Sequence, residues 1–181
     1  MANGRTTPAA VLTGPRVRLR TPRVEDAEAM FTGLSSDPQV TRYLSWTPHP
    51  NVGETRRVIT DVFDIGADST WLIEWRDTGE FVGTCGWIRP RPNTVELGYC
   101  MGRRWWRQGI MSEVAEVLVE EARRDPTVYR VTAYCHVDNA GSAGVLRRCG
   151  LTLEGRLARY AVFPNLGPEP QDCLMYGKAV R

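Results

Sequence analysis

The stretch from Glu96 to Arg124, ELGYCMGRRWWRQGIMSEVAEVLVEEARR, constrains the fold of this chain more than any other part of it. It begins as a run typical of a β-strand and then enters a turn crowded with arginine, tryptophan and glycine. Beyond the turn, apolar residues recur at helical spacing, which predicts an amphipathic helix over residues 109–124. A chain in which strands lead into such helices is an α/β protein.

The pattern of apolar residues predicts further strands and helices on both sides of this stretch. Strands are expected at residues 16–20, 70–76, 80–88, 94–101, 127–137, 151–162 and 172–180. Helices are expected at residues 21–37, 52–68, 109–124 and 139–150, with turn-rich connections at 37–51 and 89–93. The helix at 52–68 would carry four apolar residues along one side, Val58, Ile59, Val62 and Ile65. The order β-α-α-β-β-β-α-β-α-β-β contains no internal repeat, which indicates an α/β (α+β) fold.

Length and composition indicate an ordinary globular domain. The 181 residues favour one domain, which we place at residues 14–181 after a flexible tail at 1–13. The net charge of +2 gives no argument for a nucleic-acid partner, so any anion site must be local. Five scattered cysteines without a C-x-x-C pair, no signal peptide and no membrane-length apolar run favour a cytoplasmic protein. The two histidines, His49 and His136, are too few and too far apart to indicate a metal site.

The basic turn before the helix at 109–124 has the features of an anion site. The first N–H groups of a helix lack internal partners and carry the positive end of the helix dipole, so they suit a phosphate. Gly109 would let a ligand approach the backbone, and Arg103, Arg104 and Arg107 would add charge. The sequence therefore predicts a pyrophosphate site at residues 103–112. Neither a P-loop nor a G-x-G-x-x-G fingerprint is present, and a solvated basic loop that caps a helix is the alternative.

Four blocks of the sequence together resemble one known family. The loop WRQGIM (residues 106–111) is similar to the motif Q/R-x-x-G-x-G/A, and NAGSAGVLRRCGLTLEG (139–155) to N-x-x-S-x-x-v-x-x-k-x-G-F-x-x-E-G. VELGYCM (95–101) is similar to a strand that commonly reads E-i-G-Y-x-l, and GPRVRLRTPRVEDAEAMF (14–31) to an opening that contains R-L-x-L-R. In this order the blocks resemble the GCN5-related N-acetyltransferase (GNAT) superfamily over most of residues 14–180.

Within this superfamily the chain resembles the ribosomal-protein-alanine N-acetyltransferase branch, whose loop often reads W-G-Q-G-Y-A. Trp106, Gln108 and Gly109 match that loop. Arg107 and Met111 depart from it, because small residues are usual at both positions. Met111 would either crowd the phosphate loop or pack inward, and the first of these outcomes favours a non-catalytic CoA-binding module.

The resemblance implies a GNAT fold: a mixed, mostly antiparallel central sheet with helices on both faces, and the strands at 96–101 and 128–137 parallel and splayed. It implies acetyl-CoA as cosubstrate, with pantetheine between these strands and pyrophosphate on backbone amides of residues 107–112. The implied partners are acetyl-CoA and an amine acceptor, without nucleic acid or membrane, in a monomer or homodimer. The residues implied to bind the cosubstrate are Tyr99, Met101, Arg104, Arg107, Gln108, Gly109, Ile110, Met111, Ser112, Asn139 and Ser142.

The resemblance also implies roles in catalysis. Glu96 is the candidate general base for the incoming amine, and a hydrogen-bonded strand acid is the alternative. Ser142 would stabilise the departing thiolate and Asn139 would contact pantetheine, whereas the alternatives are a surface serine and a plain N-cap. A backbone N–H near Tyr99 to Met101 would stabilise the oxyanion.

The implied activity is transfer of an acetyl group to a primary amine, with a peptide or protein N-terminal α-amine as first choice. A small amine (aminoglycoside, polyamine or amino acid) and a non-catalytic CoA-binding module are alternatives, and a nucleic-acid binder lacks any supporting motif. Some relatives carry a second acid after the strand at 151–162, but here no acid occurs before Glu169. Tyr160 and Phe163 are expected to line the acceptor cleft in its place.

Overall fold

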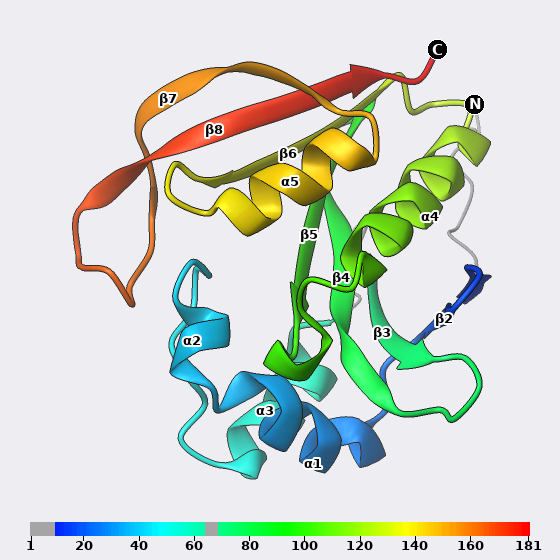
Figure 1. Ribbon diagram of the computed structural model, residues 1–181, viewed down its shortest axis with the longest axis vertical. Coiled ribbons are helices and arrows are strands. Elements are labelled where there is room, and N and C mark those ends of the chain that lie inside the picture. The colour runs from blue at the N-terminus through cyan, green and yellow to red at the C-terminus, as the bar shows by residue number, and fades with distance from the viewer. Residues whose placement is uncertain (1–9, 64–68) are drawn as a thin grey trace.

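The computed structural model describes residues 10–63 and 69–181, and it is built on one eight-stranded sheet in the order β1-β2-β3-β4-β5-β6-β8-β7 (Figure 1). The strands are β1 Val11–Thr13, β2 Val17–Arg20, β3 Ser69–Trp75, β4 Phe81–Arg91, β5 Thr94–Met101, β6 Arg130–His136, β7 Thr152–Val162 and β8 Pro170–Ala179. The α-helices are α1 Ala27–Met30, α2 Pro38–Thr41, α3 Val52–Asp61, α4 Ile110–Arg124 and α5 Ala140–Arg148. Within the described residues, no helix has both the length and the apolar character that a membrane span requires.

The sheet is antiparallel except where β5 and β6 run parallel, as the resemblance implied. β5 and β6 pair only from Thr94 to Glu96 and from Arg130 to Thr132. Beyond these rungs β6 stays paired with β8 as far as His136, while β5 stays paired with β4 as far as Met101. The two strands therefore diverge (Figure 1), and the prediction of a splayed pair is confirmed.

The core forms where the long helix α4 packs on the sheet. Ile110, Val114 and Leu118 recur at helical spacing and are fully buried, together with Val95 of β5. This contact confirms the amphipathic helix that the sequence predicts at 109–124. After the helix ends, Asp125 accepts a hydrogen bond from the buried Arg89 of β4 at 2.5 Å, which ties the far end of α4 to the sheet.

The N-terminal part of the chain differs from the sequence prediction in two places. Residues Val11–Thr13, expected in the tail, form β1 against β2, because Leu12 is buried in the core; a three-residue strand is too short to show periodicity. The single helix expected at 21–37 is also wrong. It divides into a 3₁₀ turn, α1 and a π-helical turn at Phe31–Ser35, which brings the Gly33 carbonyl to 2.5 Å from the position of a Cβ on Gly102.

Three other boundaries need correction. The connection expected at 37–51 contains α2, because the Asp37 side chain accepts a hydrogen bond from the Gln39 amide and so caps a helix that starts at Pro38. The loop expected at 89–93 is partly strand, since β4 runs to Arg91 with a register shift after Ile88 that takes Pro90 out of regular pairing. The helix expected at 52–68 ends at Asp61 as α3, and Ile65 lies outside the described residues.

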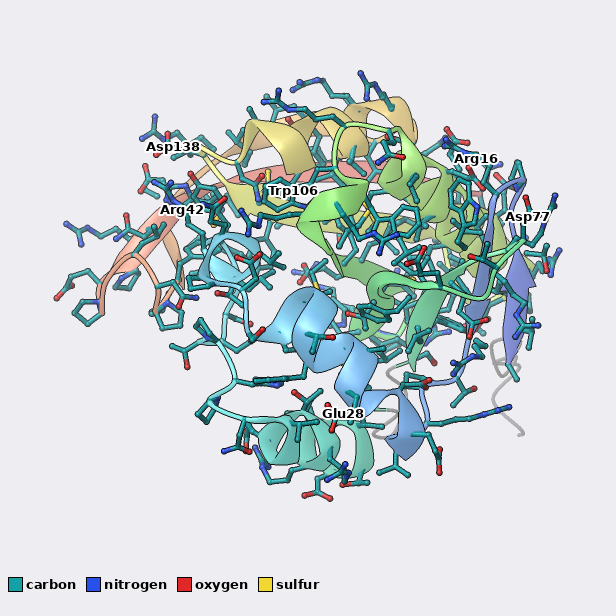
Figure 2. The ribbon with its side chains drawn as sticks, turned by 60° about the horizontal axis from the view of Figure 1, so that its bottom comes forward. Arg16, Glu28, Arg42, Asp77, Trp106 and Asp138 are labelled. Carbon is teal, nitrogen blue, oxygen red and sulfur yellow. The ribbon has the colours of Figure 1, made fainter. Side chains whose placement is uncertain are left out.

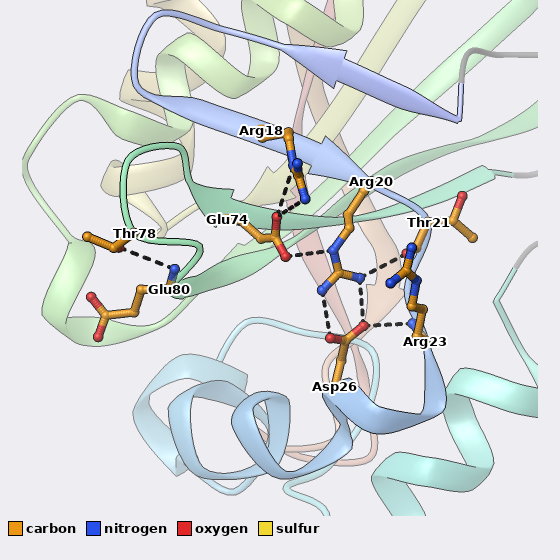
Figure 3. Close-up of polar contacts among 8 residues, drawn as sticks. All are labelled: Arg18, Arg20, Thr21, Arg23, Asp26, Glu74, Thr78 and Glu80. Atoms are coloured by element: carbon orange, nitrogen blue, oxygen red, sulfur yellow. Dashed lines mark hydrogen bonds and ion pairs between the residues drawn. The ribbon is translucent and has the colours of Figure 1, made fainter.

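A network of charged side chains ties the N-terminal helices to the sheet (Figure 3). Glu74 of β3 accepts hydrogen bonds from Arg18 and Arg20 of β2, and Arg20 also donates two bonds to Asp26 at 2.7 and 2.8 Å. Burial acts to raise the pKa of Asp26, but the hydrogen bonds from Arg20 and the Arg23 amide outweigh it, so the pKa is lowered. The network therefore holds α1 in a defined position over the sheet.

Candidate active site

The two faces of β5 hold different parts of the candidate site. Successive side chains of a strand point to opposite faces. Tyr99 lies on the face that α5 covers, where its hydroxyl is 2.9 Å from the Ser142 hydroxyl. Cys100 lies on the opposite face, where it lines a pocket with residues of α1 and α3. Glu96 and Gly98 share the Cys100 face because they alternate with Leu97 and Tyr99.

The N-terminus of α4 follows β5 in the chain, and the helix contacts β5, the strand that diverges from β6. Gly109 precedes the helix with a left-handed backbone (φ +74°), a conformation that glycine adopts without strain. The Glu113 amide is bonded to the Gly109 carbonyl, so the preceding amides of residues 110–112 belong to the first helical turn and have no intrahelical partner. The hydroxyl of Ser112 is also buried and has no hydrogen-bond partner among the described residues. These donors fit a phosphate group.

The two departures from the family loop behave differently. Met111 is 4% exposed and packs into the core, so its side chain does not crowd the loop. Arg107 has a left-handed backbone (φ +62°) at the position where the ribosomal branch often has glycine. The usual glycine is explained by this conformation, which is costly for a residue with a Cβ.

Replacing Arg107 with Gly is expected to raise the free energy of unfolding by about 0.5–1 kcal/mol. The left-handed backbone costs about 1–2 kcal/mol, and the extra freedom of glycine in the unfolded chain offsets about 0.4–1 kcal/mol. Thermal unfolding without acetyl-CoA should show a melting temperature about 2 °C higher. Arg104→Gly, in the 3₁₀ turn Arg103–Trp105, should lower it; equal shifts for the two variants would contradict the interpretation.

The arginines of the loop are not all available to an anion. Arg103 donates to Asp37 at 2.5 Å, and Arg104 pairs with Glu80 at 2.6 Å. Arg107 is exposed and pairs with no carboxylate in residues 10–63 and 69–181. Of the positive charge that the sequence places in this turn, two guanidinium groups are therefore neutralised by neighbours that the local sequence does not identify.

Other contacts give the loop its shape. Trp106, labelled in Figure 2, donates its indole N–H to the Met101 carbonyl at 2.8 Å, and the Gln108 side chain donates to the Arg104 carbonyl at 2.8 Å. Arg16 donates to the Gln108 carbonyl at 3.1 Å and to Glu113 at 2.8 Å. Sequence reasoning did not select Arg16 as a site residue, although it belongs to the N-terminal block that resembles the family.

The N-terminus of α5 brings two of the predicted residues together. The Asn139 side chain accepts a hydrogen bond from the Ser142 amide at 3.0 Å, which is the geometry of an N-cap. Burial raises the pKa of Tyr99 well above its usual value, and the hydrogen bond with Ser142 opposes this shift only in part. Tyr99 therefore keeps its proton and can donate it to Ser142, so that the serine hydroxyl can donate its own proton to a further acceptor. The Cys135 thiol also lies within hydrogen-bonding reach of Ser142.

Glu96 lies half-buried near the last shared rung of β5 and β6. Burial raises the pKa of its carboxyl group, and Arg91 lowers it by a smaller amount. The carboxylate accepts no hydrogen bond from the residues that the structure describes, which does not match the alternative of a hydrogen-bonded strand acid. The rings of Tyr134 and Tyr160 meet edge to face at 5.1 Å. Burial raises the pKa of both tyrosines, and the nearby charge of Glu96 adds a smaller rise. A carboxylate with a raised pKa suits a general base.

The structure also places Tyr160 and Phe163, which are expected to line the acceptor cleft, and the strand residue His136. His136 accepts a hydrogen bond from the Asp138 amide at 3.1 Å and stacks on Tyr43 at 5.0 Å, as expected of a satisfied strand histidine. Phe163 packs edge-on against His136 and is buried. Tyr160 is exposed and lies beside Tyr134, and both tyrosines lie near Glu96.

A pocket of about 550 Å³ opens on the Cys100 face of β5. It lies between α1, α3, the loop at 46–50 and the strands β4 and β5, which contribute Thr84 and Cys100. The side chain of Asn165, in the turn between β7 and β8, donates to the carbonyls of Thr41 and Trp46 and so holds one wall in place. Sequence reasoning missed this pocket because its lining comes from segments far apart in the chain.

Comparison with known proteins identifies the family of this chain. The family described as "Acetyltransferase (GNAT) domain" matches residues 16–152, so the chain belongs to the GNAT acetyltransferase family. An uncharacterized N-acetyltransferase, p20 of Bacillus licheniformis, is 31% identical over 150 residues, 80% of this chain and 84% of the relative. The ribosomal-protein-serine acetyltransferase of Escherichia coli is 35% identical over 78 residues, 43% of each chain.

Solved structures share the fold. A RimL ribosomal L7/L12 α-N-protein acetyltransferase in complex with coenzyme A has a TM-score of 0.75 at 22% identity, over 93% of this chain and 97% of that chain. The prediction of a GNAT fold and of membership in this superfamily is thereby confirmed.

Proposed function

We propose that this protein transfers an acetyl group from acetyl-CoA to the α-amine of a peptide or protein N-terminus. The observation that carries the proposal is the Gly109 turn, whose unpaired amides and buried Ser112 hydroxyl begin the helix that follows β5, the strand that diverges from β6. Calorimetric titration with acetyl-CoA, followed by an assay of thiol release with peptide acceptors, tests it. Binding without turnover on any amine would instead favour a non-catalytic CoA-binding module.

The residues present fit acetyl-CoA as substrate. Backbone amides of residues 107–112 would hold its pyrophosphate, and Arg107 would add an unpaired positive charge. Beyond Glu96 the edge of β5 that faces β6 pairs with no strand among the described residues, and its main chain near Tyr99 would bind the pantetheine arm as a neighbouring strand would. The Met101 carbonyl at the end of this edge already accepts the Trp106 indole N–H. When bound, acetyl-CoA supplies an acetyl group activated as a thioester.

The protein's own groups then move protons on the two faces of β5. Glu96 accepts a proton from the attacking amine, directly or through one water, as the nitrogen forms a bond to the acetyl carbon. The bond from that carbon to sulfur breaks, and the Ser142 hydroxyl donates a proton to the departing sulfur. Tyr99, whose hydroxyl is 2.9 Å from the Ser142 hydroxyl, replaces that proton and recovers its own from solvent.

An α-amine is the acceptor that this machinery suits best. A peptide α-amine has a pKa of about 7.7–8.0, whereas a lysine side chain has about 10.4, so the α-amine loses its proton far more readily near neutral pH. A single carboxylate with a raised pKa is then a sufficient base. Two proteins that this chain resembles bear the names of ribosomal-protein acetyltransferases.

Since acetyl-CoA and reduced thiols are abundant in the cytoplasm, and the cysteines at 85, 100, 135, 149 and 173 are free, we propose a cytoplasmic location for the protein.

Replacing Ser142 with Ala is expected to lower kcat roughly 10- to 100-fold, the low end of the effect of a positioned proton donor. The dissociation constant of acetyl-CoA should change less than about twofold, because the serine acts only on the departing sulfur. Steady-state kinetics and calorimetry measure the two quantities. Tyr99→Phe should reproduce part of the loss in kcat, and a Ser142→Ala variant that loses affinity and turnover equally would identify Ser142 as a binding residue.

A further inference from the structure

Gly98 of β5 is a glycine that neither packing nor backbone conformation explains. Its backbone is not left-handed, and a Cβ built on it meets nothing within 4 Å. By contrast, a Cβ on Gly83 or Gly86 of the neighbouring β4 would overlap backbone carbonyl oxygens, so those two glycines are required by close packing. Because glycine weakens a strand interior, an unexplained one marks a place where something else approaches the backbone.

The surroundings of Gly98 indicate what could approach it. Glu96 and Cys100 flank it on the same face of β5, with Cα atoms about 13 Å apart at the usual strand rise. Cys100 and its cross-strand neighbour Thr84 form the floor of the 550 Å³ pocket. The next residue, Tyr99, reaches Ser142 on the opposite face. A stretch of strand without a side chain at Gly98 therefore lies between the candidate base and the pocket. Tyr99 and Ser142 lie on the opposite face of the same strand.

The described lining of the pocket is mostly apolar, and its charged residues are paired. Its walls include Met30, Trp46, Val58 and Phe63. Its charged lining residues, Glu54 and Arg57, neutralise each other through two hydrogen bonds at 2.7 and 3.0 Å. His49 is held at 2.8 Å by Thr55, and burial lowers its pKa, so it is uncharged at neutral pH. A group that enters this pocket must therefore be apolar or satisfy its own polar atoms.

From this arrangement we infer that the acceptor is a primary amine attached to a bulky apolar group and carrying one positive charge. The apolar group fills the pocket, and the amine lies over Gly98, within reach of Glu96. This inference rests on the proposed function. The same chemistry occurs in a peptide that begins with Phe, Leu or Met and in a small arylalkylamine. A polyamine or an aminoglycoside fits poorly, because its second ammonium group would enter a pocket in which Glu54, the one carboxylate among the described lining residues, is already paired.

The acceptor preference tests the inference directly. Two peptides that differ only in the first residue, Phe or Ser, are compared with phenethylamine, spermidine and kanamycin in an assay of thiol release. The Phe peptide should exceed the Ser peptide at least about tenfold in kcat/KM, because an apolar side chain gains its binding energy only in a pocket that it fills. Spermidine and kanamycin should be the poorest acceptors. Whether the Phe peptide or phenethylamine is better identifies the source of the amine.

The failures of the two proposals can be told apart. Absence of turnover with every amine would contradict the proposed function. Turnover in which the Ser peptide or spermidine equals or exceeds the Phe peptide would leave acetyl transfer standing and overturn the apolar acceptor.

Variants supply a second test. Gly98→Val should lower kcat/KM for the Phe peptide at least about tenfold, with the acetyl-CoA dissociation constant unchanged within about twofold. Gly155→Val on β7 is the matched control, since a Cβ on Gly155 also meets nothing within 4 Å, and it should keep wild-type kinetics. Trp46→Ala, which removes a side chain from the pocket wall, should reduce the ratio of kcat/KM for the Phe peptide to kcat/KM for the Ser peptide. Wild-type kinetics in Gly98→Val, or an unchanged ratio in Trp46→Ala, would overturn the inference.

Discussion

Replacing Gly109 with Asp is expected to weaken acetyl-CoA binding by at least about 100-fold. The substitution would place a negative charge at the start of α4, where we expect the pyrophosphate. Two like charges about 5 Å apart repel by about 3 kcal/mol at the effective dielectric of a protein surface, which corresponds to roughly 100-fold in affinity. Calorimetric titration with acetyl-CoA measures the loss.

The matched control is Gly109→Asn. Asparagine has the shape of aspartate and tolerates the left-handed backbone of this position (φ +74°) equally well, but it carries no charge. A Cβ on Gly109 has only the Arg16 guanidinium within 4 Å, at 3.8 Å, so both side chains can be accommodated. The Asn variant should therefore lose far less affinity. Equal affinities for Asp and Asn would show that the phosphates bind elsewhere and would remove the basis of the proposed function.

Replacing Glu96 with Gln is expected to lower kcat/KM for the acceptor about 100-fold near neutral pH. Burial raises the pKa of Glu96 above its ordinary 4.5, so the wild-type rate should fall as the pH drops through that raised value and the carboxylate takes up a proton. In both proteins the rate also falls as the pH drops through the pKa of the acceptor amine, about 7.7–8.0, because the protonated amine cannot attack. The variant should therefore lose the more acidic limb and keep the other, which a profile from about pH 5 to about pH 9 would resolve.

Stability separates the catalytic role of Glu96 from a structural one. A carboxyl group whose pKa is raised in the folded state destabilises the protein above its unfolded pKa, because folding then buries a charge. Glu96→Gln should thus be at least as stable as the wild type at neutral pH, although it is much less active. Glu120→Gln, an exposed carboxylate of α4 paired with Arg123, is the control and should change neither quantity. A destabilised Glu96→Gln with an unaltered pH profile would contradict the base assignment.

Much of the fold followed from the sequence because it depends on neighbours in the chain. The strand that ends at Met101 was predicted with its observed bounds, and α4 begins within one residue of its predicted start. Both have apolar residues at the period of their own secondary structure. Asn139 and Gly150 mark the ends of α5 through local capping geometry, with Gly150 in the left-handed conformation. The block motifs around these elements identified the family.

Features that depend on remote segments were not accessible in this way. The three residues of β1 are defined by the burial of Leu12, and the π-helical turn by the packing of Gly33 against Gly102. The candidate site shows the same limit. The sequence selected Glu96, Gly109 and Ser142, but it contained no sign of the contact between Tyr99 and Ser142 or of the pocket.

The sequence by itself determined the order of the strands from β2 to β8 and of the helices α3, α4 and α5. It also determined the glycine that begins α4 and membership in an acetyltransferase family, since short-range periodicity and local motifs carry this information. Only the tertiary structure decided that Met111 packs inward, that Arg103 and Arg104 are neutralised by Asp37 and Glu80, and that Cys100 lines a mostly apolar pocket. The physical reason is that burial and charge pairing are set by residues that folding brings together from distant parts of the chain.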